Sequence, residues 1–210
     1  KKDEVLVKTN IWGAVQFPGV HYMPLGTRFL DAISYSGGPI DSADADKIVL
    51  PGVGAFGDAA AELKRQNLMA PLQQAILNKK PFFGICLGLQ LLFKTSEESP
   101  EGEGLNAIPG KVQLFRSKNI KIPQMGWNQV VWQKDHPLIK NVPTNSYFYF
   151  VHSYYAAPAK KEMTLGQTTY GEETFTSVLA HENIFATQFH PEKSQKAGLE
   201  ILKNFIAWQP

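Results

Sequence analysis

The sequence predicts an α/β fold built on a doubly wound, mostly parallel β-sheet with an antiparallel excursion. Two features indicate this fold. From Asp46 onward, short apolar runs alternate with glycine loops and helical stretches, the order typical of parallel sheets. Beyond residues 101–110 the pattern changes to strands with alternating aromatic residues, which favours antiparallel pairing before the chain returns to the α/β core.

The first part of this α/β region contains two short buried strands, expected at residues 47–50 and 81–85. Between them lie two helical stretches, 58–68 and 71–80, which Pro71 separates. This strand, loop and helix alternation is the main reason for expecting a parallel arrangement.

The second part begins with strands expected at residues 111–115, 128–132 and 146–157, where aromatic and β-branched residues are frequent. A last strand at 184–189 and a terminal helix at 194–208 then restore the strand-to-helix order. The antiparallel strands are therefore expected as an insertion into one α/β domain.

The N-terminal segment, residues 1–45, differs in character from the main domain, residues 46–210. It reads as two strands around the Pro18-Gly19 turn, followed by a short helix for which Thr27 is the N-cap. A chain of 210 residues is long enough for one sizeable core and a small appendage of this kind.

Composition excludes several classes of function. A net charge of +2 gives no electrostatic reason to bind nucleic acid, and no apolar stretch approaches the ~18 residues needed to span a membrane. The single cysteine, Cys86, excludes an internal disulfide and suits a reducing compartment, so the cytoplasm is expected. No phosphate-binding loop, dinucleotide fingerprint or cluster of metal ligands occurs, so we expect no cofactor and no metal.

Cys86 lies at the centre of Gly84-Ile85-Cys86-Leu87-Gly88, where a strand is expected to meet a helix. This spacing is typical of a nucleophile elbow, a sharp turn that projects the central side chain. Glycines are expected on both sides because a β-carbon there would collide with the neighbouring strand or helix. The pattern favours a sulfur nucleophile, and the alternative is a buried structural cysteine.

A thiol nucleophile needs a general base and a group that orients the base. His190 ends an apolar strand, and Glu192 follows two positions later, so the carboxylate faces the same side as the imidazole. The alternatives are an ordinary strand-end turn, or His152 as the base, although His152 lacks an adjacent carboxylate. The other histidines are expected to be solvent-exposed: His21, His136 and His181.

A loop that follows the first buried strand, "LPGVGAF" at residues 50–56, contains two glycines whose backbone can approach a substrate closely. With the amide of Leu87 it suits an oxyanion hole. The alternative is a loop that only turns the chain.

Six motifs occur in the order "PGVGAFGDA", "GICLGLQLLF", "SEE", "MGWNQV", "YFYFVHSYY" and "QFHPEKSQ". In this combination the chain from Asp46 onward resembles the class I, triad-type glutamine amidotransferases, and within them the glutaminase subunits of imidazole glycerol phosphate synthase. The resemblance implies that Cys86 attacks the side-chain amide of L-glutamine, with His190 as general base and acid and Glu192 orienting it. Water then releases glutamate from the thioester.

The resemblance also implies roles for residues that match other positions of the family pattern. These are Gly52, Val53 and Leu87 for the oxyanion hole, Gln90, Glu98, Ser153 and Tyr154 for the amino-acid portion of glutamine, and Trp127, Tyr149 and Lys193 for the partner interface. The implied partner is a cyclase subunit with a (β/α)8 barrel through which ammonia travels. For the interface residues the alternatives are ordinary aromatic packing and a solvated charge.

Two features depart from the family pattern. Gln124 precedes "MGWN" where the family usually has histidine, which implies an altered interface or a divergent paralogue. The usual opening strand and glycine loop are also not visible. Instead, the "FPGV" and "LDAIS" stretches resemble the SLBB β-grasp segment of polysaccharide-export proteins, so the chain reads as a chimera joined near residues 43–47.

In the amidotransferase fold that the resemblance implies, another strand lies beside the strand that ends in "LPGVG". We expect a strand from residues 3–15 or 19–26 to pair there, with the N-terminal helix covering a face. The alternative is a separate small module beside the amidotransferase domain.

The sequence therefore predicts glutamine hydrolysis with ammonia delivered to a cyclase of histidine biosynthesis. One alternative is a glutaminase that feeds sugar amidation in surface-polysaccharide synthesis, which the export-like N-terminus suggests. Another is a non-catalytic chimeric or binding protein that keeps the triad only as sequence.

Overall fold

The computed structural model describes residues 6–11, 19–24, 47–117 and 120–210. The chain divides into two compact units, Lys1–Asp46 and Lys47–Pro210. The helix expected after Thr27 lies outside the described residues.

The N-terminal unit contains a two-stranded antiparallel sheet formed by β1 (Leu6–Ile11) and β2 (Gly19–Pro24). In the second unit, β3 (Ile48–Gly52) pairs in parallel with β4 (Phe82–Cys86). The expectation that an N-terminal strand pairs beside β3 concerns a contact between the two units and stays a prediction. Closing the short connection between β1 and β2 costs less chain entropy than pairing either with a strand far along the sequence.

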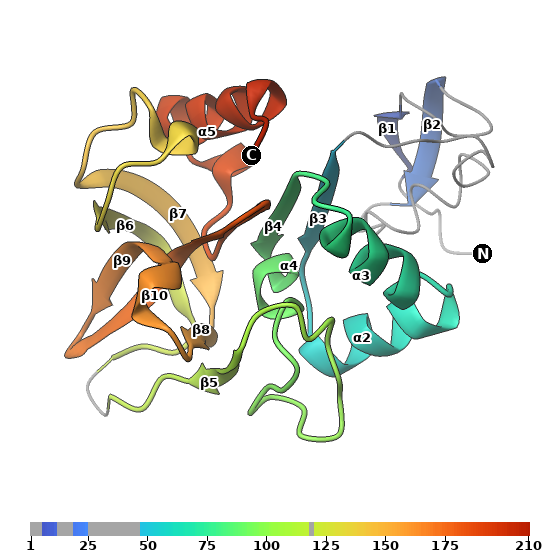
Figure 1. Ribbon diagram of the computed structural model, residues 1–210, viewed down its shortest axis with the longest axis horizontal. Coiled ribbons are helices and arrows are strands. Elements are labelled where there is room, and N and C mark those ends of the chain that lie inside the picture. The colour runs from blue at the N-terminus through green and yellow to red at the C-terminus, as the bar shows by residue number, and fades with distance from the viewer. Residues whose placement is uncertain (1–5, 12–18, 25–46, 118–119) are drawn as a thin grey trace. The chain divides into compact units, whose positions relative to one another are not determined.

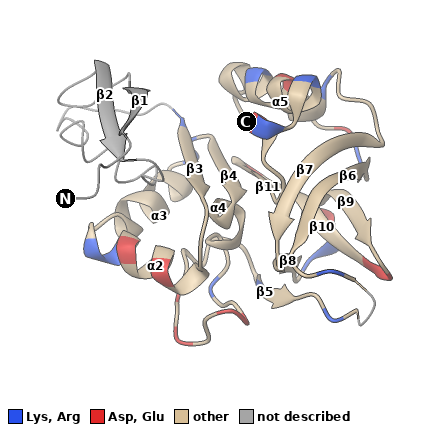
Figure 2. Cartoon of the chain, turned by 180° about the vertical axis from the view of Figure 1, so that it is seen from behind, with Lys and Arg blue, Asp and Glu red and all other residues tan. Residues whose placement is uncertain are grey.

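The second unit is organised around a nine-stranded mixed sheet with the order β3-β4-β11-β10-β9-β6-β7, to which β8 and β5 are added through β10. The parallel part consists of β3, β4 and β11 (Ile184–Thr187). These three strands carry no charged residue, and Figure 2 shows the charged residues mainly on the surrounding helices and loops. Such uniformly apolar strands are expected where a sheet is covered on both faces.

The antiparallel part is larger than the sequence indicates. Its strands are β5 (Gly110–Leu114), β6 (Gln124–Trp132), β7 (Ser146–His152), β8 (Tyr154–Pro158), β9 (Thr164–Tyr170) and β10 (Glu173–His181). Pairing of β6 with β7 places Trp127 opposite Tyr149 and Gln124 opposite His152. The α/β class expected from the sequence is confirmed, with the antiparallel strands continuing the same sheet.

Helices lie on both sides of the parallel strands. In Figure 1, α2 (Phe56–Arg65) and α3 (Met69–Leu77) lie on one side of β3 and β4, and α5 (Gln195–Ala207) lies on the other. The break between α2 and α3 occurs at Asn67, whose φ is 55°, whereas Pro71 lies in the first turn of α3, where proline is tolerated. No helix in the described part of the chain is long and apolar enough to cross a membrane.

The core between β4, β11 and α5 is rich in aromatic rings. The ring centroid of Phe83 lies 5.1 Å from those of both Phe185 and Phe205. His136 stacks on Phe185 at 5.8 Å and lies 5.7 Å from Trp208. The expectation that His136 is solvent-exposed is wrong, because the residue is partly buried beside these rings and burial lowers the pKa of its imidazole.

Candidate active site

Cys86 lies at the junction between β4 and the short helix α4 (Leu87–Gln90). Its φ of 54° and ψ of −105° fall outside the ordinary strand and helix regions. A β-carbon at Gly88 would lie 1.7 Å from the carbonyl oxygen of Leu50, and one at Gly84 would lie 2.8 Å from that of Gly88. Both glycines are therefore needed for the tight turn that presents the thiol.

His190 and Glu192 lie just beyond β11, where the 3₁₀-helix η3 (Pro191–Lys193) turns the chain. The distance from Nδ1 of His190 to Oε1 of Glu192 is 2.8 Å. Since a carboxylate can only accept, Nδ1 carries the proton, and Nε2 is the basic nitrogen of the neutral ring. The Nε2 atom is buried and has no hydrogen-bond partner within the described residues.

Electrostatic interactions in this group favour the charged imidazolium. Burial by itself lowers the pKa of His190, but interactions with Cys86 and Glu192 outweigh burial and raise the pKa to about 9. Burial is the largest single influence on Glu192 and raises its pKa, but the hydrogen bonds to His190 and to the backbone, with the nearby charges of His190 and Lys193, together outweigh burial and lower the pKa. The ring is thus prepared to accept and hold a proton beside the thiol.

Cys86 lines a pocket of about 310 Å³. The other predicted site residues that line it are Val53, Leu87, Gln90, Glu98, Ser153 and Tyr154. Gly52 does not line the pocket but pairs in register with Cys86, and a β-carbon at Gly52 would lie 3.1 Å from that of Leu87. The two parts of the sheet therefore bring the predicted oxyanion and substrate residues to one place.

Two side chains of this pocket are held by contacts within the protein. Oε2 of Glu98 accepts a hydrogen bond of 2.8 Å from the backbone N–H of Phe56, at the first residue of α2. Nε2 of Gln90 donates to the carbonyl oxygen of Tyr154 at 3.0 Å and to Oε1 of Gln188 at 3.3 Å. The walls of the pocket are thus oriented before any ligand is bound.

Gln188 is a site residue that the sequence analysis missed. Its side chain is fully buried, and its Nε2 donates to Sγ of Cys86 at 3.7 Å. One signal was present in the sequence, because Gln188 precedes His190 by two positions and residues two apart in an extended chain face the same side.

His152 lines the same pocket but is not suited to be the base. Its Nδ1 lies 2.8 Å from the carbonyl oxygen of Tyr154, and its Nε2 lies 3.1 Å from Oε1 of Gln124. Burial, with a smaller contribution from the charge of His190, lowers the pKa of His152 to about 4, against the opposing effect of the Tyr154 hydrogen bond. Gln124 is also buried, so this departure from the family pattern lies in the interior and not on an exposed face.

The three residues expected at a partner interface lie together. The rings of Trp127 and Tyr149 meet edge to face at 6.1 Å, and Nζ of Lys193 lies 5.9 Å from the Tyr149 ring centroid. Trp127 is 46% exposed, and Met125 on the same strand is 64% exposed. These exposed apolar side chains therefore do not belong to the core.

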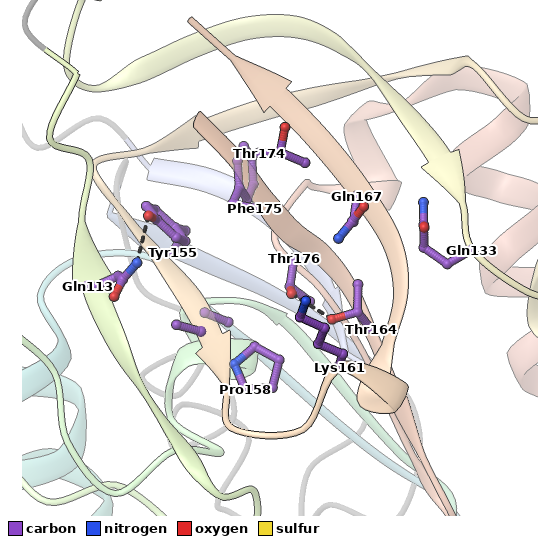
Figure 3. Close-up of a pocket in the computed structure, with 12 residues that line it drawn as sticks. Gln113, Gln133, Tyr155, Pro158, Lys161, Thr164, Gln167, Thr174, Phe175 and Thr176 are labelled. Atoms are coloured by element: carbon purple, nitrogen blue, oxygen red, sulfur yellow. Dashed lines mark hydrogen bonds between the residues drawn. The ribbon is translucent and has the colours of Figure 1, made fainter. Parts of the chain in front are cut away.

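A second pocket, of about 370 Å³, lies on β8, β9 and β10. Figure 3 shows amide and hydroxyl side chains around it, with Thr164 and Thr176 hydrogen-bonded at 2.8 Å. Lys161 is the one charged residue among those that line it, and none of them is cysteine, histidine or a carboxylate. This pocket therefore contains no thiol, imidazole or carboxylate. In the described residues, no group of three or more His, Cys, Asp or Glu side chains is placed to hold a metal ion.

Comparison with known proteins bears on what this pocket does. The family model "Glutamine amidotransferase class-I" matches residues 27–208. The chain belongs to the class I glutamine amidotransferase family. The family indicated by the six sequence motifs is thereby confirmed.

Curated relatives of this amidotransferase are strongly similar. It is 50% identical over 170 residues to the imidazole glycerol phosphate synthase subunit HisH of Microcystis aeruginosa, with 80% of each chain covered. It is 49% identical over 160 residues to the same subunit of Chlorobaculum tepidum, with 76% of this chain and 80% of the relative covered. The amidotransferase thus resembles HisH subunits over most of their length.

Two solved structures share the fold. PurLQS from Thermotoga maritima matches with a TM-score of 0.60 at 15% identity, covering 79% of this chain and 80% of that chain. The glutaminase domain of Trypanosoma brucei CTPS matches with a TM-score of 0.54 at 19% identity, covering 80% and 73%. At such identities the likeness concerns the fold alone.

Proposed function

We propose that this chain is the glutaminase subunit of an imidazole glycerol phosphate synthase. It hydrolyses L-glutamine to glutamate and ammonia and passes the ammonia to a cyclase subunit. The observation that carries the proposal is the thiol of Cys86 on its glycine-flanked turn, lining a pocket and interacting with the His190–Glu192 pair. The similarity to HisH subunits supports this choice of acceptor pathway.

In the first half of the reaction, Sγ of Cys86 forms a bond to the side-chain carbonyl carbon of glutamine, and Nε2 of His190 takes the thiol proton. The tetrahedral intermediate then collapses, and His190 returns the proton to the departing nitrogen, which leaves as ammonia. Glu192 holds the ring in the tautomer that leaves Nε2 free and stabilises its charge.

In the second half, water attacks the thioester carbon and gives a proton to Nε2 of His190. Expulsion of the sulfur with return of the proton releases glutamate and restores the thiol. The charge that develops on the carbonyl oxygen in both halves needs amide donors, and we assign these to Gly52, Val53 and the backbone N–H of Leu87. Support comes from the pairing of Gly52 with Cys86 and from Val53 and Leu87 lining the pocket.

The remaining pocket residues are assigned to the amino-acid portion of glutamine. Gln90, Glu98, Ser153 and Tyr154 all line the pocket with Cys86. Glutamine carries an ammonium and a carboxylate at this end, so a site that combines an acidic side chain with amide and hydroxyl groups suits it.

We assign the face formed by Trp127, Tyr149 and Lys193 to docking of the cyclase subunit, a (β/α)8 barrel that receives the ammonia. The exposed aromatic and apolar side chains there and the cation over the Tyr149 ring support this assignment. We place the reaction in the cytoplasm, because a single free thiol suits reducing surroundings.

The test is glutaminase activity with and without a cyclase subunit of imidazole glycerol phosphate synthase. Wild-type chain with the cyclase should release glutamate, and Cys86→Ala should lower kcat by at least about 10⁴-fold while still binding the cyclase. Turnover only with a sugar-amidating synthase would favour the alternative acceptor. No turnover and no trapped thioester with either partner would contradict a catalytic role.

A further inference from the structure

A continuous chain of hydrogen bonds runs from the substrate side of the pocket to the nucleophile. The carbonyl oxygen of Tyr154 accepts from Nε2 of Gln90, and the same nitrogen donates to Oε1 of Gln188. Nε2 of Gln188 in turn donates to Sγ of Cys86. The side chain of Gln188 therefore joins the amide that lines the substrate pocket to the sulfur.

Gln188 cannot easily adopt another arrangement. Its side chain has no exposed surface, and its backbone N–H donates to the carbonyl oxygen of Ser177 at 2.8 Å. Reversing its amide would direct Oε1 at the sulfur and Nε2 at the nitrogen of Gln90, which is already a donor. The direction of the whole chain of bonds is thus set by the carbonyl of Tyr154, which can only accept.

The bond to sulfur has a chemical consequence. A thiolate is a charged acceptor, for which a buried N–H donor is worth more than it is for a neutral thiol or a thioester. A donor aimed at Sγ of Cys86 therefore favours the sulfur when it carries charge. That condition holds when the thiol has lost its proton to His190, and again when the sulfur leaves the second tetrahedral intermediate.

We propose that Gln188 is a positioning residue of the site. Its side-chain N–H orients the sulfur of Cys86 and favours the thiolate form, and its Oε1 connects the sulfur to Gln90, which lines the substrate pocket. Its part in turnover rests on the proposed glutaminase function, whereas its effect on the sulfur does not. The competing explanation is that Gln188 is a buried polar residue that satisfies its own hydrogen bonds and only fills the core.

Alkylation of Cys86 by iodoacetamide separates the two explanations without requiring any glutaminase activity. Rates are measured against pH on the chain alone, for wild type and for Gln188→Met, which keeps the volume but has no donor. We expect about a tenfold lower rate at pH 7 in the variant and an alkylation profile moved to higher pH by about one unit. A residue that only fills the core would change the folded fraction and leave the pH midpoint of the profile unchanged.

Two further variants keep the test decisive. Gln188→Asn retains an amide but withdraws it by one methylene, and we expect it to move the alkylation profile in the same direction. This variant takes the place of Gln188→Met if Gln188→Met does not fold. Thr187→Val is the matched control, because Thr187 is the adjacent buried residue and its hydroxyl donates to the carbonyl oxygen of Phe189, away from the sulfur. This control should lower stability and leave the alkylation profile in place.

The outcomes are distinguishable from those of the glutaminase assay. A wild-type profile in folded Gln188→Met and Gln188→Asn would overturn the role of Gln188, whatever the turnover. A moved profile with no turnover by wild type would keep the role of Gln188 at the sulfur and contradict the proposed function. With the cyclase present, we expect Gln188→Met to lower kcat about tenfold, with a smaller rise in KM for glutamine.

Discussion

The two walls of the catalytic pocket are built by different means. The elbow wall consists of β3, β4 and α4, and we group with it the segment from β11 to η3, which carries His190 and does not line the pocket. This wall places Cys86 through the backbone itself, with glycines in close contact with neighbouring backbone. The antiparallel wall consists of β6, β7 and β8, and it presents side chains such as His152 and Tyr154 to the pocket from paired strands. The position of the nucleophile thus depends on tightly packed backbone atoms, whereas recognition depends on side chains that can be substituted without a change of the backbone.

The buried histidines of the two walls show the same contrast. His190 on the elbow wall has its pKa raised to about 9 by the thiol and a carboxylate, in spite of burial. His152 on the antiparallel wall has neutral carbonyl and amide partners, and burial lowers its pKa to about 4. The pocket therefore accommodates positive charge at one imidazole and excludes it at the other.

The largest expected difference between the two walls is the loss of stability caused by a substitution at the elbow glycine Gly88. We expect Gly88→Ala to lower the free energy of unfolding by at least about 4 kcal/mol, because the added β-carbon would meet the backbone oxygen of Leu50 at 1.7 Å. The control is Gly126→Ala on β6, where a β-carbon meets no heavy atom of the described chain within 4 Å and the φ of 130° costs about 1–2 kcal/mol. Equal losses in urea unfolding would show that the elbow wall can shift after all.

The next effect concerns acid stability of the antiparallel wall. Below pH 6.5 the unfolded imidazole of His152 takes a proton, whereas the folded one does so only near pH 4, so acid favours unfolding in this range. We expect this ring to remove on the order of 3 kcal/mol of stability between pH 6.5 and 4, and His152→Gln to remove that part of the pH dependence.

Unfolding curves measured at a series of pH values provide the check, with His181→Gln as a control at a strand end. The contribution of His190 has the opposite sign, since its raised pKa stabilises the folded state below pH 6.5 and that stability is lost as the pH rises through 9. An unchanged acid slope in His152→Gln would contradict the contrast between the two histidines.

A smaller effect is expected for Trp127 and should appear in binding and not in folding. Trp127→Ala should weaken binding of the cyclase subunit by about 30-fold, or about 2 kcal/mol, and change the free energy of unfolding by less than about 1 kcal/mol. The matched control is Val131→Ala, because Val131 is also 46% exposed on β6 but lies beside β9. Equal effects of the two variants on titrated affinity would remove the docking assignment.

The smallest effect tests the connection between the walls. Glu97, in the loop after α4, accepts from the backbone N–H of Leu114 at the end of β5 and pairs with Lys111 and Arg116, and these contacts lower its pKa to about 2. Glu97→Gln should lower the thermal midpoint slightly at low salt, and the difference from wild type should shrink at 1 M salt because exposed ion pairs are screened. A difference that does not depend on salt would point to packing instead.

Much of the site was predictable because its signals are local. The glycines around Cys86 and the two-residue spacing of His190 and Glu192 place reactive groups through neighbouring residues. The strands β9 and β10 were not predicted, because their sequences, such as "TLGQTTY", lack the aromatic alternation that marks β6 and β7. Two strands around the Pro18-Gly19 turn were expected, and the structure places the first of them earlier, at Leu6–Ile11, where it pairs with β2.

The order of residues alone specifies the family, the nucleophile and its base, because only glycine fits at the turn and the histidine lies two residues from its carboxylate. Folding in three dimensions decides the remaining features: that Gln188 reaches Cys86 across 102 positions of sequence, and that His152 stays neutral while His190 takes charge. Such contacts depend on how deeply each group is buried and on which atoms face it after the sheet is assembled. Neither the burial nor the neighbours can be read from the spacing of residues along the chain.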